Sequence, residues 1–228
     1  MKINYGRDEL VKIGNYKKIY KRFGLIAALH DLIISSIGKF SRFGLLYIYV
    51  HRENTATGKQ PEGLTLRPIE RQELENYVAQ YNTHMTLKSI NKSLQNNDVC
   101  IGAFINDELC SYAWFAEQPS VCSFGLVTTF SKNYAYTYDN FTFPKHRGKG
   151  LQPWIKNYAL DFYKKQGREG IITAIYSNNF SSRRATASAG ARVAGYFIYF
   201  IGKKFYFRKK FKCEGLGYNL EPIGDHQK

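Results

Sequence analysis

Apolar residues recur at three- and four-residue steps between positions 15 and 38, and this spacing predicts one amphipathic helix. Its most apolar stretch, 24–38, is interrupted by His30 and Asp31 and is shorter than the roughly 20 apolar residues that a bilayer span requires. A charged pair is easier to satisfy with protein partners than in lipid, so we expect this helix mainly to pack on the body of the protein. Weak, salt-sensitive contact with a membrane is the alternative, because four basic residues gather at the start of the helix: Lys17, Lys18, Lys21 and Arg22.

A strand at 45–50 follows, and a turn-rich linker at 54–63 marks a domain boundary. The pattern beyond it predicts strands at 63–69, 99–105, 109–115, 121–130, 134–143, 170–176, 195–201 and 203–211, with helices at 70–82, 85–96, 151–165 and 181–189. This order predicts an α+β domain over 63–212, with a mixed, largely antiparallel sheet flanked by helices. Residues 1–62 would be an N-terminal helical extension, and 213–228 a C-terminal tail.

The composition shows that the chain can form a core and that its charge is uneven. Of 228 residues 44% are hydrophobic, which excludes a disordered tail or a histone-like basic arm. Lys and Arg number 33 against 18 Asp and Glu, a net charge of +15. Residues 1–50 and 201–212 each carry +6 of this excess. That concentration indicates either a localised anionic contact or an ordinary solvated surface.

The cysteines stand at 100, 110, 122 and 213, without a C-x-x-C pair and without histidine at metal-ligand spacing. We therefore expect no metal site. The polar N-terminus does not resemble a secretory signal. Reduced thiols in a cytoplasmic protein, peripheral to a membrane at most, are the prediction.

The segment 141–151 combines the end of a strand, a proline, a basic loop with two glycines, and the start of a helix. Glycines allow several backbone N–H groups to point into one concavity. A helix N-terminus adds unpaired donors and the positive end of its dipole. Together with Lys145, Arg147 and Lys149, these groups would suit a diphosphate, although the loop matches neither a Walker A motif nor G-x-G-x-x-G.

A second segment strengthens that interpretation. The strand predicted at 170–176 leads to Asn179, and Ser182 follows three residues later. Asn-x-x-Ser at the end of a strand caps the next helix, and it leaves an amide for a ligand lying beside the strand.

These two segments resemble motifs of the GNAT superfamily of acyl-CoA-dependent N-acetyltransferases. The family loop has the form Q/R-x-x-G-x-G/A, and here Lys145 stands at the Gln/Arg position, with Gly148 and Gly150 at the two glycines. Asn179, Ser182 and Gly190 fit the second motif, whereas Ala191 replaces the usual Phe. The resemblance covers about two thirds of the chain, from about 63 to 211, and leaves residues 1–62 outside it.

The resemblance implies an acyl-CoA donor, with acetyl-CoA as the first expectation, whose thioester a primary amine attacks directly. The loop would hold the pyrophosphate, and the strand ending at Phe143 would bond the pantetheine arm. The implied cofactor-binding residues are Phe141, Phe143, Lys145, His146, Arg147, Gly148, Lys149, Gly150, Leu151, Asn179 and Ser182.

Catalytic residues are less clearly indicated. Many members of the family have a tyrosine acid four residues after the serine; here that position is Thr186, and Ser188 lies nearby, and both hydroxyls are poor acids. Asp139 is the sole carboxylate between Glu117 and Asp161, and it could accept a proton from the amine through water. A satisfied polar residue at a strand bend is the other interpretation of Asp139.

Three functions remain open at this point. The first is acetyl transfer to a small amine or an amino sugar. The second is transfer of a longer acyl chain from CoA or from acyl carrier protein, whose acidic surface would complement a basic one. The third is a catalytically degenerate fold that binds an anionic polymer or a membrane; nucleic acid is not an expected partner, and the oligomeric state is not predicted.

Overall fold

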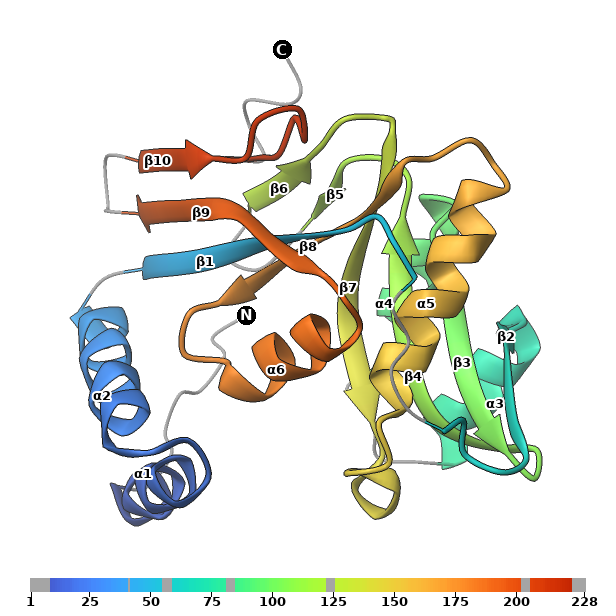
Figure 1. The fold of residues 1–228 in the computed structure, drawn as a ribbon, viewed down its shortest axis with the longest axis horizontal. Helices are drawn as coiled ribbons and strands as arrows, with labels where there is room; N and C mark the ends of the chain where they lie inside the picture. Colours follow the sequence, from blue (N-terminus) through green and yellow to red (C-terminus); the bar gives the residue numbers. More distant parts are fainter. Residues whose placement is uncertain are drawn as a thin grey trace.

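The computed structural model describes residues 9–40, 42–54, 59–80, 85–121, 126–201 and 206–222. Its helices are α1 (Glu9–Phe23), α2 (Leu25–Phe40), α3 (Arg71–Gln80), α4 (Leu87–Gln95), α5 (Leu151–Lys164) and α6 (Phe180–Ser188). Its strands are β1 (Arg42–His51), β2 (Leu64–Pro68), β3 (Val99–Ile105), β4 (Glu108–Ala116), β5 (Ser120–Val121), β6 (Leu126–Thr129), β7 (Tyr134–Thr142), β8 (Gly170–Tyr176), β9 (Arg192–Ile201), β10 (Tyr206–Lys212) and β11 (Asn219–Pro222). Figure 1 shows their arrangement.

Eight strands form the main sheet, in the order β10-β9-β1-β8-β7-β4-β3-β2. Each neighbouring pair is antiparallel except β7 and β8, which are parallel. A separate sheet has the order β11-β6-β5. The expected α+β fold, with a mixed and largely antiparallel sheet flanked by helices, is confirmed.

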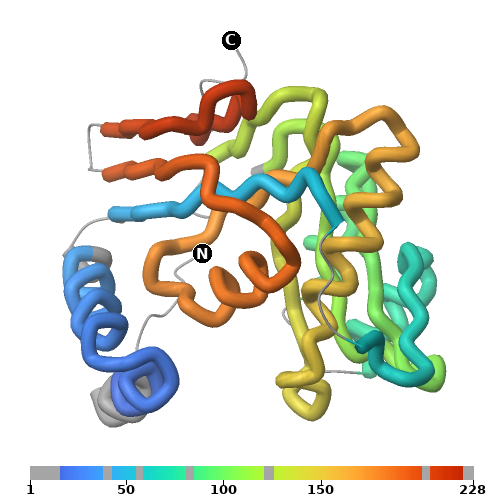
Figure 2. The backbone as a smooth tube through the Cα atoms, viewed as in Figure 1, coloured from blue at the N-terminus to red at the C-terminus, as the bar shows by residue number. Residues whose placement is uncertain are grey.

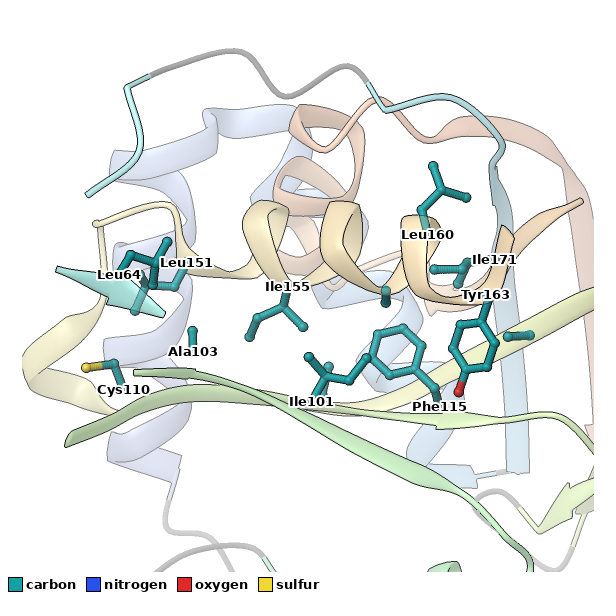
Figure 3. Packing of buried hydrophobic residues seen from close by; sticks show 13 residues of the cluster. Leu64, Ile101, Ala103, Cys110, Phe115, Leu151, Ile155, Leu160, Tyr163 and Ile171 are labelled. Carbon is teal, nitrogen blue, oxygen red and sulfur yellow. The ribbon is translucent and has the colours of Figure 1, made fainter. Parts of the chain in front are cut away.

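Alternate residues of β4 supply two cores, one on each face of the sheet, because successive side chains of a strand point to opposite faces. Ala113 and Phe115 belong to one buried cluster with Ile155 and Ala159 of α5, and Figure 3 shows Ile155 pointing from α5 towards the strands. On the opposite face, Tyr112 and Trp114 pack with Leu74 of α3 and Ile90 of α4. Strands β3 and β4 are thereby held between helices on both sides.

The single helix predicted over 15–38 is instead two helices, because Gly24 between them has φ 86. That left-handed conformation is available to glycine and ends the α1 helix there. The expectation that the apolar stripe packs on the body is also wrong for α2, whose leucines and isoleucines are largely exposed. α1 and α2 lie at the periphery of the molecule, on the side away from α5 (Figures 1 and 2).

Strand β1, which belongs to the segment predicted as an extension, lies inside the main sheet. It pairs with β8 through Leu46↔Tyr176 on one side and with β9 through Leu46↔Phe197 on the other. Ile48 of β1 is fully buried. The first 51 residues thus supply a central strand of the same sheet as residues 64–212, whereas the division at the 54–63 linker stays a prediction.

The strand expected over 121–130 is divided into β5 and β6, and the residues between them, Cys122 included, lie outside the described part of the chain. β6 pairs with β11, a strand in the segment expected to be a tail. The expected last hairpin is present as antiparallel β9 and β10, although Gly202 lies outside the described residues. Cys100, Cys110 and Cys213 are free and buried.

Candidate active site

The parallel strands β7 and β8 separate after three paired positions. Their ladder runs from Tyr134↔Gly170 to Tyr136↔Ile172, whereas β7 continues to Thr142 and β8 to Tyr176. β7 also changes register against β4 between Tyr112 and Trp114, and Asp139, opposite this irregularity, has φ 46. A β-bulge bends a strand, so β7 is directed towards the 144–150 loop while β8 leads to α6 (Figures 1 and 2).

A cleft of about 470 Å³ lies where the two strands separate. Its polar lining comes from both strands and from the start of α6: Thr137, Asp139, Asn140, Thr173, Asn179 and Ser182. Other lining residues are apolar or aromatic: Leu46, Leu126, Tyr136, Tyr199, Tyr218 and Leu220. The sequence predicted polar cleft residues such as Asp139 and Asn179. It did not predict the apolar and aromatic residues, which come from strands far apart in the chain.

Beyond the end of β7, the loop expected to bind a diphosphate is open to solvent. Gly148 has φ 84 and Gly150 has φ 69, and a Cβ added to either would meet no atom within 4 Å. Gly150 is the N-cap of α5, and no side chain caps this helix end. The first backbone donors of α5 are therefore left for solvent or for a ligand, which suits an anion.

Gln152 in the first turn of α5 fixes this helix end beside the cleft strands. Its Nε2 donates to the Tyr112 carbonyl oxygen at 2.9 Å and to the Phe141 carbonyl oxygen at 3.2 Å. It also donates to Oγ of Ser111 at 2.9 Å. The loop is thus held against β4 and β7 by a residue that the sequence motif did not include.

The basic residues of the loop face different partners. Lys145 forms an ion pair with Glu108, which lowers the pKa of that carboxyl. Buried His146 places Nε2 3.4 Å from Oε2 of the same carboxylate. Arg147 donates from Nε to the Thr142 carbonyl oxygen at 3.1 Å. Lys145, Arg147 and Lys149 are all exposed, but Lys145 is paired with Glu108 on β4, so Arg147 and Lys149 are the loop cations best placed for a phosphate.

The expected cap at the start of α6 is confirmed. Oδ1 of Asn179 accepts from the backbone N–H of Ser182 at 3.2 Å, and both residues line the cleft. Phe141 and Phe143 are at and just beyond the end of β7; Phe143 is buried, and Leu151 begins α5 in the core.

Among the three candidate catalytic residues, the structure places Asp139 alone in the cleft lining. Thr186 is fully buried between α5 and α6, where its hydroxyl accepts a hydrogen bond from Nζ of Lys156. Ser188 is exposed and donates to the carbonyl oxygen of Ala185 at 2.9 Å. Neither hydroxyl is brought together with Asp139.

Lys156 was missed by the sequence reasoning. It is 4% exposed, and burial lowers its pKa to about 7. Buried His51 on β1 has a lowered pKa, first because of burial and then because of the charge of Lys156. Its burial could have been predicted from its position inside the apolar arc of α5, directly after Ile155 and four residues before Leu160.

No protein-family model and no curated protein matches this sequence. Among solved structures, the chain is similar to an acetyltransferase of the GNAT family from Novosphingobium aromaticivorans, with 15% identity over 69% of this chain and 63% of that chain (TM-score 0.48). A GNAT-family acetyltransferase from Colwellia psychrerythraea gives 16% over 79% and 62% (TM-score 0.49). AAC(6')-Iy, solved with a bisubstrate analogue containing CoA, gives 14% over 56% and 89% (TM-score 0.44).

The matched region spans about three fifths of the length of the first two of these structures. At such identities the likeness concerns the fold alone. Within the described residues, no group of three or more His, Cys, Asp or Glu side chains is arranged to hold a metal ion.

Proposed function

We propose that this protein is an acyl-CoA-dependent N-acyltransferase whose donor lies between β7 and β8. The observation that carries the proposal is the separation of these strands after Tyr136↔Ile172, which leaves a polar-edged cleft beside an uncapped helix N-terminus. The glycine loop and the first turn of α5 would take the pyrophosphate. The facing edges of β7 and β8 would bond the pantetheine amides as an added strand would.

In the proposed reaction, the amine nitrogen attacks the thioester carbonyl, a C–N bond forms and the C–S bond breaks. The products are an amide and the CoA thiol, and the amine loses one proton overall. Asp139, exposed at the cleft, would accept that proton through water. The thiolate would leave without an acid from Thr186, because that hydroxyl is buried against Lys156.

A longer acyl chain is a second candidate for the donor. Apolar residues of the cleft lining, Leu46, Leu126 and Leu220 among them, belong to one buried cluster with Phe197. A chain that replaced water there would gain about 0.8 kcal/mol per buried CH₂ group. A series of acyl-CoA donors of increasing length, assayed for release of the thiol, distinguishes acetyl from long-chain transfer.

CoA binding to the purified chain tests the proposal. We expect CoA to raise the Tm, because a ligand that binds the native state stabilises it. Gly148→Asp should abolish the shift by placing a carboxylate in the proposed phosphate site. Gly167→Asp is the matched control, since Gly167 has φ 82, has open space around its Cβ, and follows the other end of α5. A CoA shift that survives in Gly148→Asp and is lost in Gly167→Asp would contradict the assignment.

Asp139→Asn separates chemistry from binding. Asparagine tolerates the left-handed backbone at this position nearly as well as aspartate. The thiol-release rate should fall on the order of 10²-fold, the usual contribution of a general base, while the CoA-induced Tm shift stays as in the wild type. Unchanged turnover in Asp139→Asn would remove Asp139 from the mechanism.

A further inference from the structure

Helix α2 presents its apolar side to solvent. Ile26 is 85% exposed and Ile33 is 58% exposed. Residues three, four and seven positions apart lie on one side of a helix, and the exposed apolar residues have this spacing: Leu25, Ile26, Leu29, Leu32, Ile33 and Ile37. The exposed stripe therefore runs along most of α2. In the described residues, no helix is long and apolar enough to cross a bilayer.

The side of α2 that faces the protein is the polar one. Asp31 accepts from Nδ2 of Asn178 at 2.9 Å. The ring of His30 lies edge-on to Phe180, with 5.9 Å between the ring centroids, and Ala27 is buried. The charged interruption that makes this helix unsuited to span lipid is thus directed into the protein. What remains outside is a continuous apolar stripe.

Positive charge immediately precedes this stripe in the sequence. Lys17, Lys18, Lys21 and Arg22 are all exposed on the last turns of α1, and Arg22 precedes Leu25 of α2 by three residues. Between residues 9 and 40 the two acids are Glu9 and Asp31, and Asp31 faces Asn178. A second copy docked by two-fold symmetry would bring two such basic clusters together, which is unfavourable. An anionic lipid surface complements both the charge and the stripe.

We propose that α1 and α2 form a docking surface for an anionic lipid bilayer. α2 lies in the plane of the interface with its stripe among the upper acyl chains, while the bases of α1 contact the headgroups. The segment 178–182 links this surface to the cleft: Asn178 and Phe180 contact α2, and Asn179 and Ser182 line the cleft. Docking would bring this end of the cleft close to the membrane.

Flotation of the full chain with vesicles tests the surface. Binding is expected to vesicles containing phosphatidylglycerol, to weaken as salt rises, and to be absent with phosphatidylcholine alone. The double variant Ile26→Glu/Ile33→Glu should lose binding. Leu87→Glu is the matched control, because Leu87 on α4 is 53% exposed and lies outside the surface. Both changes sit at exposed positions, so Tm and the CoA-induced shift should stay as in the wild type.

The contribution of the bases is measured in the same way. Lys18→Gln/Lys21→Gln should weaken binding to phosphatidylglycerol vesicles by about thirtyfold, since each base near an anionic surface contributes about 1 kcal/mol. Lys88→Gln/Lys92→Gln, at exposed positions on α4, should change it little. Wild-type vesicle binding by Ile26→Glu/Ile33→Glu would overturn the proposal. A lipid-free dimer that this variant dissociates, with no vesicle binding by the wild type, would also overturn it and assign the stripe to a second copy.

Discussion

Helices α5 and α2 have similar apolar periodicity and opposite surroundings. α5 is covered along its apolar arc: Ile155, Ala159 and Leu160 are fully buried, and Ile155 points towards the strands of the sheet (Figure 3). α2 turns its polar side to the protein and leaves residues such as Ile26 outside. Periodicity shows that a helix has two different sides, whereas the packing of the remaining chain decides which of them is covered.

The two helices also have different proposed roles. α5 begins at the loop proposed to hold the CoA pyrophosphate, and its burial keeps that loop fixed through contacts such as Gln152 to Phe141. α2 contributes little to the core, so its stripe has no evident role in folding. In the proposals above, the buried helix α5 supports the cofactor site, whereas the exposed side of α2 binds a membrane surface.

The largest expected effect is a difference in stability between two isoleucine-to-alanine variants, one on each helix. Ile155→Ala removes a fully buried side chain and should lower the free energy of unfolding by about 2–5 kcal/mol. Ile33→Ala, at 58% exposure, should change it by less than about 0.5 kcal/mol. Urea unfolding of both variants measures the difference. Equal losses would mean that the α2 stripe is covered in solution.

A smaller effect is expected from the one charge inside the buried arc of α5. The pKa of Lys156 falls to about 7 in the folded chain, below its ordinary value of 10.5. Between these values the unfolded chain binds more protons, so this group makes stability rise as pH rises from about 7 towards 10. Below pH 7 the cost of the buried charge is present in full.

Lys156→Met should remove this contribution. The stability of the wild type relative to Lys156→Met should increase by about 3 kcal/mol between pH 6 and pH 9. Lys165→Met, an exposed lysine just after α5, is the control and should leave the pH profile unchanged. A wild-type and a Lys156→Met profile that run parallel from pH 6 to pH 9 would show that Lys156 is solvated in the folded protein.

Much of the region from 64 to 201 was predictable because its signals are local. The strand Gly170–Tyr176 follows from a short apolar run, and the capping of α6 by Asn179 follows from side-chain chemistry within a few residues. The glycine loop before α5 was equally visible. Gly24 was also visible as a residue, but the apolar spacing that continues across it concealed the break between α1 and α2.

The remaining features depend on contacts between distant segments. Nothing local to Leu46 indicates that β1 lies between β8 and β9, or that Leu46 and Tyr199 line the cleft together. The hydrogen bond from Lys156 to Thr186 depends on how α5 and α6 pack. That packing explains why Thr186, chosen by its position in a motif, is not beside Asp139.

The central claim is that acyl-CoA binds along the separated edges of β7 and β8, and hydrogen–deuterium exchange with and without CoA tests it most directly. The account predicts slower amide exchange at residues 137–140 and 173–176 and in the first turn of α5 after Gly150, because those backbone groups would bond the ligand. α2 and α4 should exchange at the same rate in both samples. Saturating CoA that leaves the two strand edges unchanged, or protects residues outside the cleft and the loop instead, would contradict the account.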